Sequence, residues 1–141
     1  MKILFVVSEV EDLVKTGGLA DVAKSLPLAL NESGHEVLIV MPYYQTLANK
    51  FNAEECAAKQ VLFAENRPYE FAYGDNAERF AFFAHAALKT AQAMDFQPDI
   101  VHCNDWHTAL TPYFLSIDNS GFFNHTKSVF TIHNGAYQGT H

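Results

Sequence analysis

The sequence predicts an α/β fold in which a doubly wound, mainly parallel, Rossmann-like sheet carries helices on both faces. Two observations support this prediction. Short apolar runs of the kind that form buried parallel strands alternate with longer segments whose apolar residues recur at helical spacing. The chain also has 141 residues, of which 49% are hydrophobic, and this is enough to bury one core. We therefore expect residues 1–141 to form a single Rossmann-like domain.

The first 41 residues predict a strand, a helix and a second strand. Residues 2–8 and 36–41 are apolar runs that are typical of buried strands. Between them, residues 18–33 carry apolar side chains at helical spacing, and Gly34 should end this helix. Pro27 lies within the helical pattern, so we expect a kink or an irregular turn there. Together these elements form a βαβ unit with a right-handed crossover.

Residues 43–76 have the weakest pattern in the chain. A helix over residues 47–59 and a short strand over residues 61–64 are compatible with the sequence. Residues 67–69 and 74–76 have the composition of turns. This region is therefore the least defined part of the predicted sheet.

The last part of the chain returns to a clear alternation. Residues 77–94 keep their apolar side chains on one helical face, and residues 100–103 form a third apolar strand. Asp105 is well placed to cap a helix over residues 106–117. Residues 128–132 then form a fourth strand. Strands that alternate with helices in this way favour a parallel sheet.

Three polar segments directly follow predicted strands. They are residues 9–18, 104–107 and 133–137. In doubly wound sheets, ligands bind beyond the carboxyl ends of the strands. We therefore expect these three segments to converge on one crevice.

The first of these segments has the chemistry of a phosphate site. Gly17 and Gly18 permit close approach of a ligand, the following helix start offers unpaired N–H groups, and Lys15 adds a positive charge. An ordinary strand-to-helix turn with a solvated lysine remains an alternative. Asp21, in the first helical turn, is either a favourable charge near the positive end of the helix or an active-site residue.

The other two segments leave similar alternatives open on local grounds. His133 is either a packed residue at a strand end or a ligand contact, and Asn134 is either a turn residue or a ligand contact. Asp105 is a helix cap or a catalytic group. Trp106 either stacks on a ligand or packs in the core, and we expect His107 to be structural.

Composition excludes several classes of protein. The net charge of −7 argues against a general nucleic-acid surface. No apolar stretch approaches 18 residues, and the charged and polar residues near the N-terminus leave no room for a signal peptide, so we expect a cytoplasmic protein with no membrane association. Cys56 and Cys103 show no metal-ligand spacing and are expected to be free thiols. The sequence shows no pair of carboxylates clustered across a cleft, and this argues against a glycoside hydrolase.

Four blocks of sequence resemble the bacterial glycogen synthases and plant starch synthases. The first extends to Val22 as SEV-x4-KTGGLADV, and the others are the blocks at residues 75–83 (DNAERFAFF), 104–110 (NDWHTAL) and 131–139 (TIHNGAYQG). The blocks occur in the order of that family and extend over nearly the whole chain. We therefore identify the sequence as resembling the amino-terminal part of such an enzyme.

This resemblance implies a glycosyltransferase of the two-Rossmann-domain (GT-B) type. It would transfer glucose from ADP-glucose, with retention, to the non-reducing end of an α-1,4-glucan such as glycogen, with no metal or other cofactor. The donor phosphates would be stabilised by basic side chains, N–H groups and helix dipoles. We predict catalytic roles for His133 and Asp105. The predicted substrate-binding residues are Lys15, Gly17, Gly18, Asp21, Asn134, Trp106 and Glu9, with Glu9 facing the acceptor glucan.

The sequence departs from that family in two ways. The second, carboxyl-terminal Rossmann domain is absent from this chain, and the region 43–76 is shorter than usual. We therefore expect the 141 residues alone to have no transferase activity and to self-associate through uncovered surface. One alternative is a non-catalytic module that binds a nucleotide or a glucan. Another, a Rossmann-like domain for a different phosphorylated ligand, would leave the last sequence block unexplained.

Overall fold

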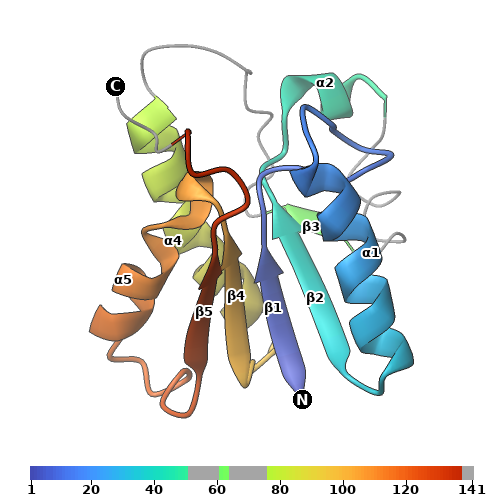
Figure 1. The fold of residues 1–141 in the computed structure, drawn as a ribbon. Coiled ribbons are helices and arrows are strands. Elements are labelled where there is room, and N and C mark those ends of the chain that lie inside the picture. Colours follow the sequence, from blue (N-terminus) through green and yellow to red (C-terminus); the bar gives the residue numbers. More distant parts are fainter. Residues whose placement is uncertain (51–60, 64–75, 138–141) are drawn as a thin grey trace.

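The computed structural model describes residues 1–50, 61–63 and 76–137. It contains a five-stranded sheet in the order β3-β2-β1-β4-β5, and every neighbouring pair is parallel (Figure 1). The strands are β1 (Lys2–Val6), β2 (Glu36–Met41), β3 (Val61–Phe63), β4 (Ile100–Asn104) and β5 (Lys127–Thr131). The predicted parallel sheet is therefore confirmed.

Successive strands are added to one side of the central strand β1 and then to its other side. Val6 of β1 pairs with Val40 of β2 on one side and with Cys103 of β4 on the other. After β1, the chain forms β2 and β3 on one side of β1, and then returns across the sheet to form β4 and β5 on the other side. The reversal places a topological switch point at the carboxyl ends of β1 and β4, which is where doubly wound sheets bind ligands.

Helices cover both faces of the sheet. The described helices are α1 (Leu19–Glu32), α2 (Gln45–Ala48), α4 (Asn76–Ala93) and α5 (Thr111–Ile117), with a short 3-10 turn η1 (Trp106–Thr108). Figure 1 shows α1 against β1 and β2 on one face, with α4 and α5 together on the other. In the described part of the chain, no helix is both long enough and apolar enough to cross a bilayer. The doubly wound arrangement is confirmed.

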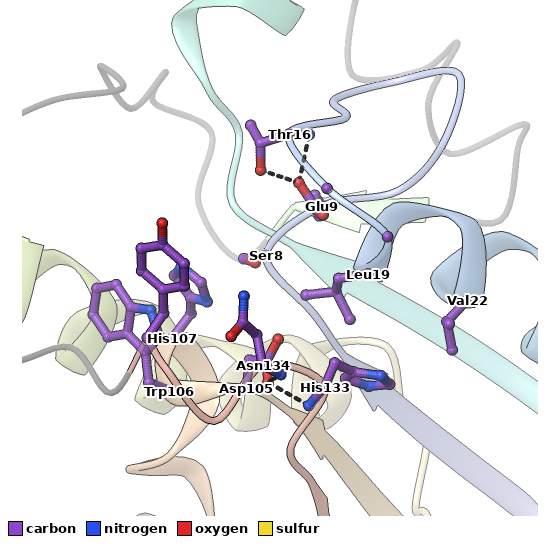
Figure 2. A pocket seen from close by; sticks show the side chains of 13 residues that line it. Ser8, Glu9, Thr16, Leu19, Val22, Asp105, Trp106, His107, His133 and Asn134 are labelled. Atoms are coloured by element: carbon purple, nitrogen blue, oxygen red, sulfur yellow. Dashed lines mark hydrogen bonds between the residues drawn. The ribbon is translucent and has the colours of Figure 1, made fainter.

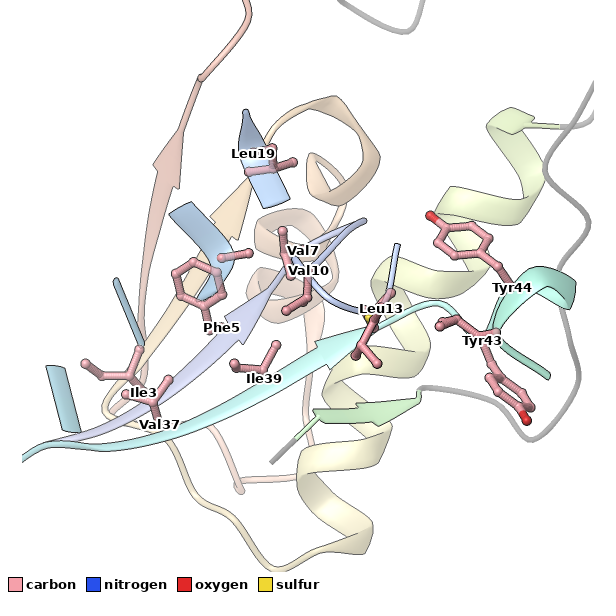
Figure 3. Packing of buried hydrophobic residues seen from close by; sticks show 13 residues of the cluster. Ile3, Phe5, Val7, Val10, Leu13, Leu19, Val37, Ile39, Tyr43 and Tyr44 are labelled. Atoms are coloured by element: carbon pink, nitrogen blue, oxygen red, sulfur yellow. The ribbon is translucent and has the colours of Figure 1, made fainter. Parts of the chain in front are cut away.

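The two faces of the sheet have separate hydrophobic cores. Side chains alternate along β1, so Ile3 and Phe5 pack beneath α1 (Figure 3), whereas Leu4 and Val6 pack beneath α4. All four are 5% exposed or less. This burial on both faces explains why β1 and β2 are nearly continuous apolar runs.

The end of α1 follows the prediction. Gly34 has a φ of 87°, a conformation that favours glycine. The N–H groups of Gly34 and His35 donate to the carbonyls of Asn31 and Leu30, each at 3.0 Å, which closes a Schellman motif. The helix continues through the buried Pro27 as a single element.

The predicted helix over residues 106–117 is wrong, and so is the predicted cap by Asp105. The structure has the 3-10 turn η1 followed by a separate helix α5, with Pro112 in the first turn of α5. Proline is favoured in the first turn of a helix, where its missing N–H costs no hydrogen bond, so Pro112 suits the start of a new helix. The Asp105 side chain caps nothing in this stretch, because its carboxylate is used elsewhere.

Part of the region 43–76 is described. The predicted short strand is present as β3, and α2 covers only the beginning of the predicted helix over residues 47–59. Residues 51–59 of that helix and both predicted turns lie outside the described residues, except for residue 76.

Candidate functional site

The three polar segments meet in one cavity of about 650 Å³ at the carboxyl ends of the strands. One part of the lining follows β1, one follows β4 and one follows β5, as Figure 2 shows. The lining residues are Ser8, Glu9, Thr16, Gly17, Gly18, Leu19, Val22, Asp105, Trp106, His107, His133, Asn134 and Tyr137. The predicted convergence of the three segments is thus confirmed.

Seven of the nine predicted site residues line this cavity, and Lys15 and Asp21 do not. The seven are Glu9, Gly17, Gly18, Asp105, Trp106, His133 and Asn134. Sequence reasoning did not assign Ser8, Thr16, Leu19, Val22, His107 and Tyr137 to the site. Five of these six lie inside or directly beside one of the three polar segments, and Val22 lies in the first turn of α1, so the segments themselves were the available signal.

Lys15 forms ion pairs outside the cavity. Its Nζ lies 2.6 Å from Oδ1 of Asp21 and 3.5 Å from Oε1 of Glu11. The hydrogen bond with Asp21 raises the pKa of Lys15 and lowers the pKa of Asp21. Lys15 is therefore charged, and two carboxylates compensate this charge. A phosphate role for Lys15 and a site role for Asp21 remain predictions.

The buried carboxylate of Glu9 closes the loop that precedes α1. Its Oε2 accepts hydrogen bonds from the Thr16 backbone N–H, at 2.7 Å, and from the Thr16 hydroxyl (Figure 2). Its Oε1 accepts the N–H of Ala20, in the first turn of α1, at 3.1 Å. Glu9 thus supplies the capping interaction that Gly18, which has no side chain, cannot make.

Gly17 and Gly18 do not require the special conformations of glycine. Gly18 has φ −70° and ψ −16°, and only Gly34 and Gly121 have positive φ among the described glycines. A Cβ at Gly17 would come no closer than 3.8 Å to Glu9, and one at Gly18 would meet no atom within 4 Å. Both glycines line the cavity, and their predicted role of leaving room for a ligand remains a prediction.

Asp105 fixes the loop that follows β5. Its Oδ1 accepts the backbone N–H of His133 at 2.7 Å and that of Asn134 at 3.3 Å. Its own N–H donates to the carbonyl of Thr131 at 3.0 Å, and its carbonyl accepts the N–H of Thr108 at 3.0 Å. The Asp105 side chain therefore joins the segments after β4 and β5, two of the three walls of the cavity.

Aromatic rings form the next part of the wall. The rings of Trp106 and His107 stack with centroids 4.1 Å apart, and Phe80 of α4 meets both rings edge-on. Burial lowers the pKa of His107 to about 4, so its imidazole is neutral near pH 7. The packing supports the predicted structural role of His107, although this ring also lines the cavity.

The cavity can bind a polar ligand through several kinds of group. It offers the backbone at Gly17 and Gly18, the imidazole of His133, the side chain of Asn134 and the aromatic face of Trp106. Among the residues that the structure describes, no three His, Cys, Asp or Glu side chains gather in a way that could hold a metal ion. These groups are of the kind that contact a hydroxyl-rich ligand.

Comparison with known proteins gives consistent matches. The family model for the starch synthase catalytic domain matches residues 2–141. A glycogen synthase of Aeromonas salmonicida is 44% identical over 177 residues, which cover 99% of this chain and 36% of that protein. A glycogen synthase of Photobacterium profundum is 43% identical over 175 residues, covering 99% of this chain and 34% of that protein.

The structural comparison agrees with these matches at the level of the fold. The catalytic domain of starch synthase IV from Arabidopsis thaliana, bound to ADP and acarbose, superimposes with a TM-score of 0.74 and 22% sequence identity. The match covers 96% of this chain and 34% of the plant chain. The chain thus spans about a third of the length of these relatives. The aligned regions exceed 141 residues, which agrees with a shortened internal region.

Proposed function

Because this chain belongs to the starch synthase catalytic domain family, we propose that it forms part of an enzyme that transfers glucose from ADP-glucose to an α-1,4-glucan. Transfer would occur to the non-reducing end, with retention of configuration. The observation that carries the proposal is the single cavity formed by three of the four family-like sequence blocks. This cavity lies at the switch point of the sheet, where such folds bind nucleotides.

The donor phosphates are assigned to the wall near the start of α1. Gly17 and Gly18 leave room for them there, and Lys15 lies on the same loop. Binding would exchange the ion pair between Lys15 and Asp21 for a contact between Lys15 and a phosphate. Departure of ADP would then be assisted without a metal ion.

The sugar is assigned to the opposite wall. His133 would contact the donor glucose, and Asn134 would contact sugar hydroxyls. Trp106 would pack against a glucose ring, and Glu9 would face the acceptor glucan. Asp105 supports this wall by fixing the backbone of His133 and Asn134. Positive charge near the anomeric carbon would be stabilised by nearby carbonyl oxygens.

The complete enzyme requires more than these residues. The relatives are about three times as long, and we propose that the additional length carries the second Rossmann domain of a GT-B glycosyltransferase, with most contacts to the nucleotide. Residues 1–141 would then bind ADP-glucose weakly and fail to transfer glucose. We place the enzyme in the cytoplasm. Incorporation of labelled glucose into glycogen by the purified chain would contradict this part of the proposal.

A pair of lysine variants tests the phosphate assignment. Lys15 and Lys24 are both exposed, and each forms one ion pair at 2.6–2.7 Å and a second at 3.5 Å, with Glu11 in common. Only Lys15 lies beside the proposed phosphates. We expect Lys15→Met to weaken ADP binding by about tenfold or more. Lys24→Met should leave it unchanged.

Binding of ADP to the two variants and the parent chain can be measured by calorimetry or by NMR titration. Equal affinities for the Lys15→Met variant and the parent would remove Lys15 from the site. Equal losses in both variants would show that only the general charge of the surface matters.

A further inference from the structure

Asn104, the last residue of β4, is fully buried. Its side-chain Nδ2 donates to the carbonyl oxygen of Val6 at 3.1 Å and to that of His102 at 3.3 Å. Its Oδ1 lies 2.9 Å from Nε2 of His133. The side chain therefore connects the end of β1 with the residue that lines the cavity after β5.

These contacts determine how protons are placed on His133. The carbonyl oxygens of Val6 and His102 only accept hydrogen bonds, so the NH₂ group of Asn104 must face them. The amide oxygen then faces His133 and can only accept, so Nε2 of His133 must carry a proton. In the neutral imidazole, the other nitrogen, Nδ1, is consequently an acceptor.

We propose that Asn104 is a positioning residue for the cavity. It holds His133 as the Nε2-protonated imidazole and leaves Nδ1 as the ring atom that accepts a hydrogen bond from a ligand. Asp105 fixes the backbone of the same residue, so ring and main chain are oriented by two successive residues at the end of β4. A ligand that donates from a hydroxyl or N–H group is favoured at this position over one that only accepts.

The burial of Asn104 supports this role. A fully buried amide is costly unless its hydrogen bonds are made, and here both the NH₂ group and the oxygen have partners. If Asn104 had a purely structural role and only donated a hydrogen bond to the carbonyl of Val6, the protonation of the His133 ring would not depend on Asn104. The two roles therefore predict different behaviour of the His133 ring.

A neighbouring histidine provides a matched control. Nε2 of His102 lies 2.8 Å from the Thr131 hydroxyl, on the same pair of strands. A hydroxyl can donate or accept, so Thr131 does not determine which nitrogen of His102 is protonated. Replacement of Thr131 by valine should therefore change the spectrum of His102 and leave His133 as it is.

The experiment is imidazole NMR of the ¹⁵N-labelled chain without ligand, at a pH where His133 is neutral. In the parent we expect Nε2 of His133 to be protonated, its Hε2 to be protected from exchange with water, and a cross-peak from Hε2 to the side chain of Asn104. Asn104→Leu, which keeps the number and branching of the side-chain heavy atoms, should abolish the protection. Thr131→Val should preserve it.

Three results would overturn the proposal: a His133 ring protonated on Nδ1, an Hε2 that exchanges freely in the parent, or protection that persists in Asn104→Leu. If Asn104→Leu does not fold, the parent spectrum alone decides, through the tautomer and the cross-peak. The inference rests on the proposed function only for the nature of the ligand. Since no ligand is added, failure of this test is distinct from failure to bind ADP-glucose.

Discussion

The carboxylate of Asp105 accepts two successive backbone N–H groups, while its own backbone has φ 58° and ψ 176°. This conformation costs a residue other than glycine about 1–3 kcal/mol, so the surrounding hydrogen bonds must maintain it. Strain of this kind gathers at functional sites. At Asp105 it coincides with the wall of the cavity, which supports a functional origin.

Removal of this carboxylate should loosen the loop after β5. We expect Asp105→Ala to lower the free energy of unfolding by about 1.5–3 kcal/mol, because charge-assisted hydrogen bonds are lost. Asp105→Asn, which retains an acceptor oxygen, should lose less. Urea unfolding gives the free energies, and hydrogen exchange at His133 and Asn134 reports on the loop.

Asp118 is the control for this prediction. It accepts the N–H and hydroxyl of Ser120 in an exposed turn, so Asp118→Ala should change stability by less than about 1 kcal/mol. If Asp105→Ala left both stability and exchange at His133 and Asn134 unchanged, the carboxylate would have no positioning role.

His107 makes stability depend on pH in a defined direction. Burial lowers its pKa from 6.5 to about 4, so the folded state favours the neutral ring. Above pH 6.5 the ring is neutral in both states. As the pH falls from 6.5 toward 4, the unfolded chain binds a proton more readily, and up to about 3 kcal/mol of stability is lost.

His107→Phe should reduce this loss, because phenylalanine preserves the stacking against Trp106 and Phe80 without a titrating group. Urea unfolding at about pH 7 and about pH 4.5 measures the effect. Burial also lowers the pKa of His102, so some pH dependence should remain in the variant. Parallel losses in variant and parent would exclude His107 as the cause.

At the scale of the elements, prediction succeeded where the information was local. β2 matches its predicted bounds because an apolar run and Pro42 define it, and α1 ends where Gly34 requires. The stretch predicted as one helix over residues 106–117 is divided into η1 and α5, and Pro112 lies in the first turn of α5. The partners of the Asp105 carboxylate lie 28 and 29 residues away, so no local pattern reveals them.

Two glycine substitutions distinguish a glycine that is needed for its backbone conformation from one that is needed to leave room for a ligand. Gly34→Ala should destabilise the chain by about 1 kcal/mol or more, because φ is 87° there. Gly17→Ala should leave stability within about 0.5 kcal/mol, since the new Cβ has ordinary contacts, yet it should weaken ADP binding. Thermal unfolding and ADP titration of both variants check this. A Gly17→Ala variant that binds ADP normally would contradict the ligand-space explanation.

At the scale of the molecule, the surface around β5 is unusually apolar. Leu110, Tyr113 and Ile117 are exposed on and beside α5, and Val129 and Phe130 are 44% and 41% exposed on β5. β5 is also an edge strand of the sheet, with one side unpaired within the described residues. Exposed apolar patches and open strand edges promote association.

We therefore expect the 141-residue chain to self-associate in a concentration-dependent manner. Val129→Lys should reduce association because it places a charge on the edge strand. Leu28→Lys, at a residue 53% exposed on α1, should not. Sedimentation velocity over a range of concentrations measures both. A monomeric parent, or equal effects of the two variants, would contradict the assignment of the interface to β5.

The whole-molecule prediction from sequence was correct in class, strand direction and the convergence of the polar segments. These features follow from the alternation of elements and from the rule that parallel strands end at one edge. The ion pairs of Lys15, the capping by Glu9 and the amide network of Asn104 were not predicted. Each depends on side-chain directions in the folded molecule, which sequence spacing does not determine.

The most direct test of the central claim is an NMR titration of the labelled chain with ADP-glucose, read at the backbone amides. The account predicts saturable shifts at Gly17, Gly18, His133 and Asn134, on two walls of one cavity. Shifts confined to another surface, such as the cleft between α4 and α5, or no shifts at saturating ligand, would contradict it.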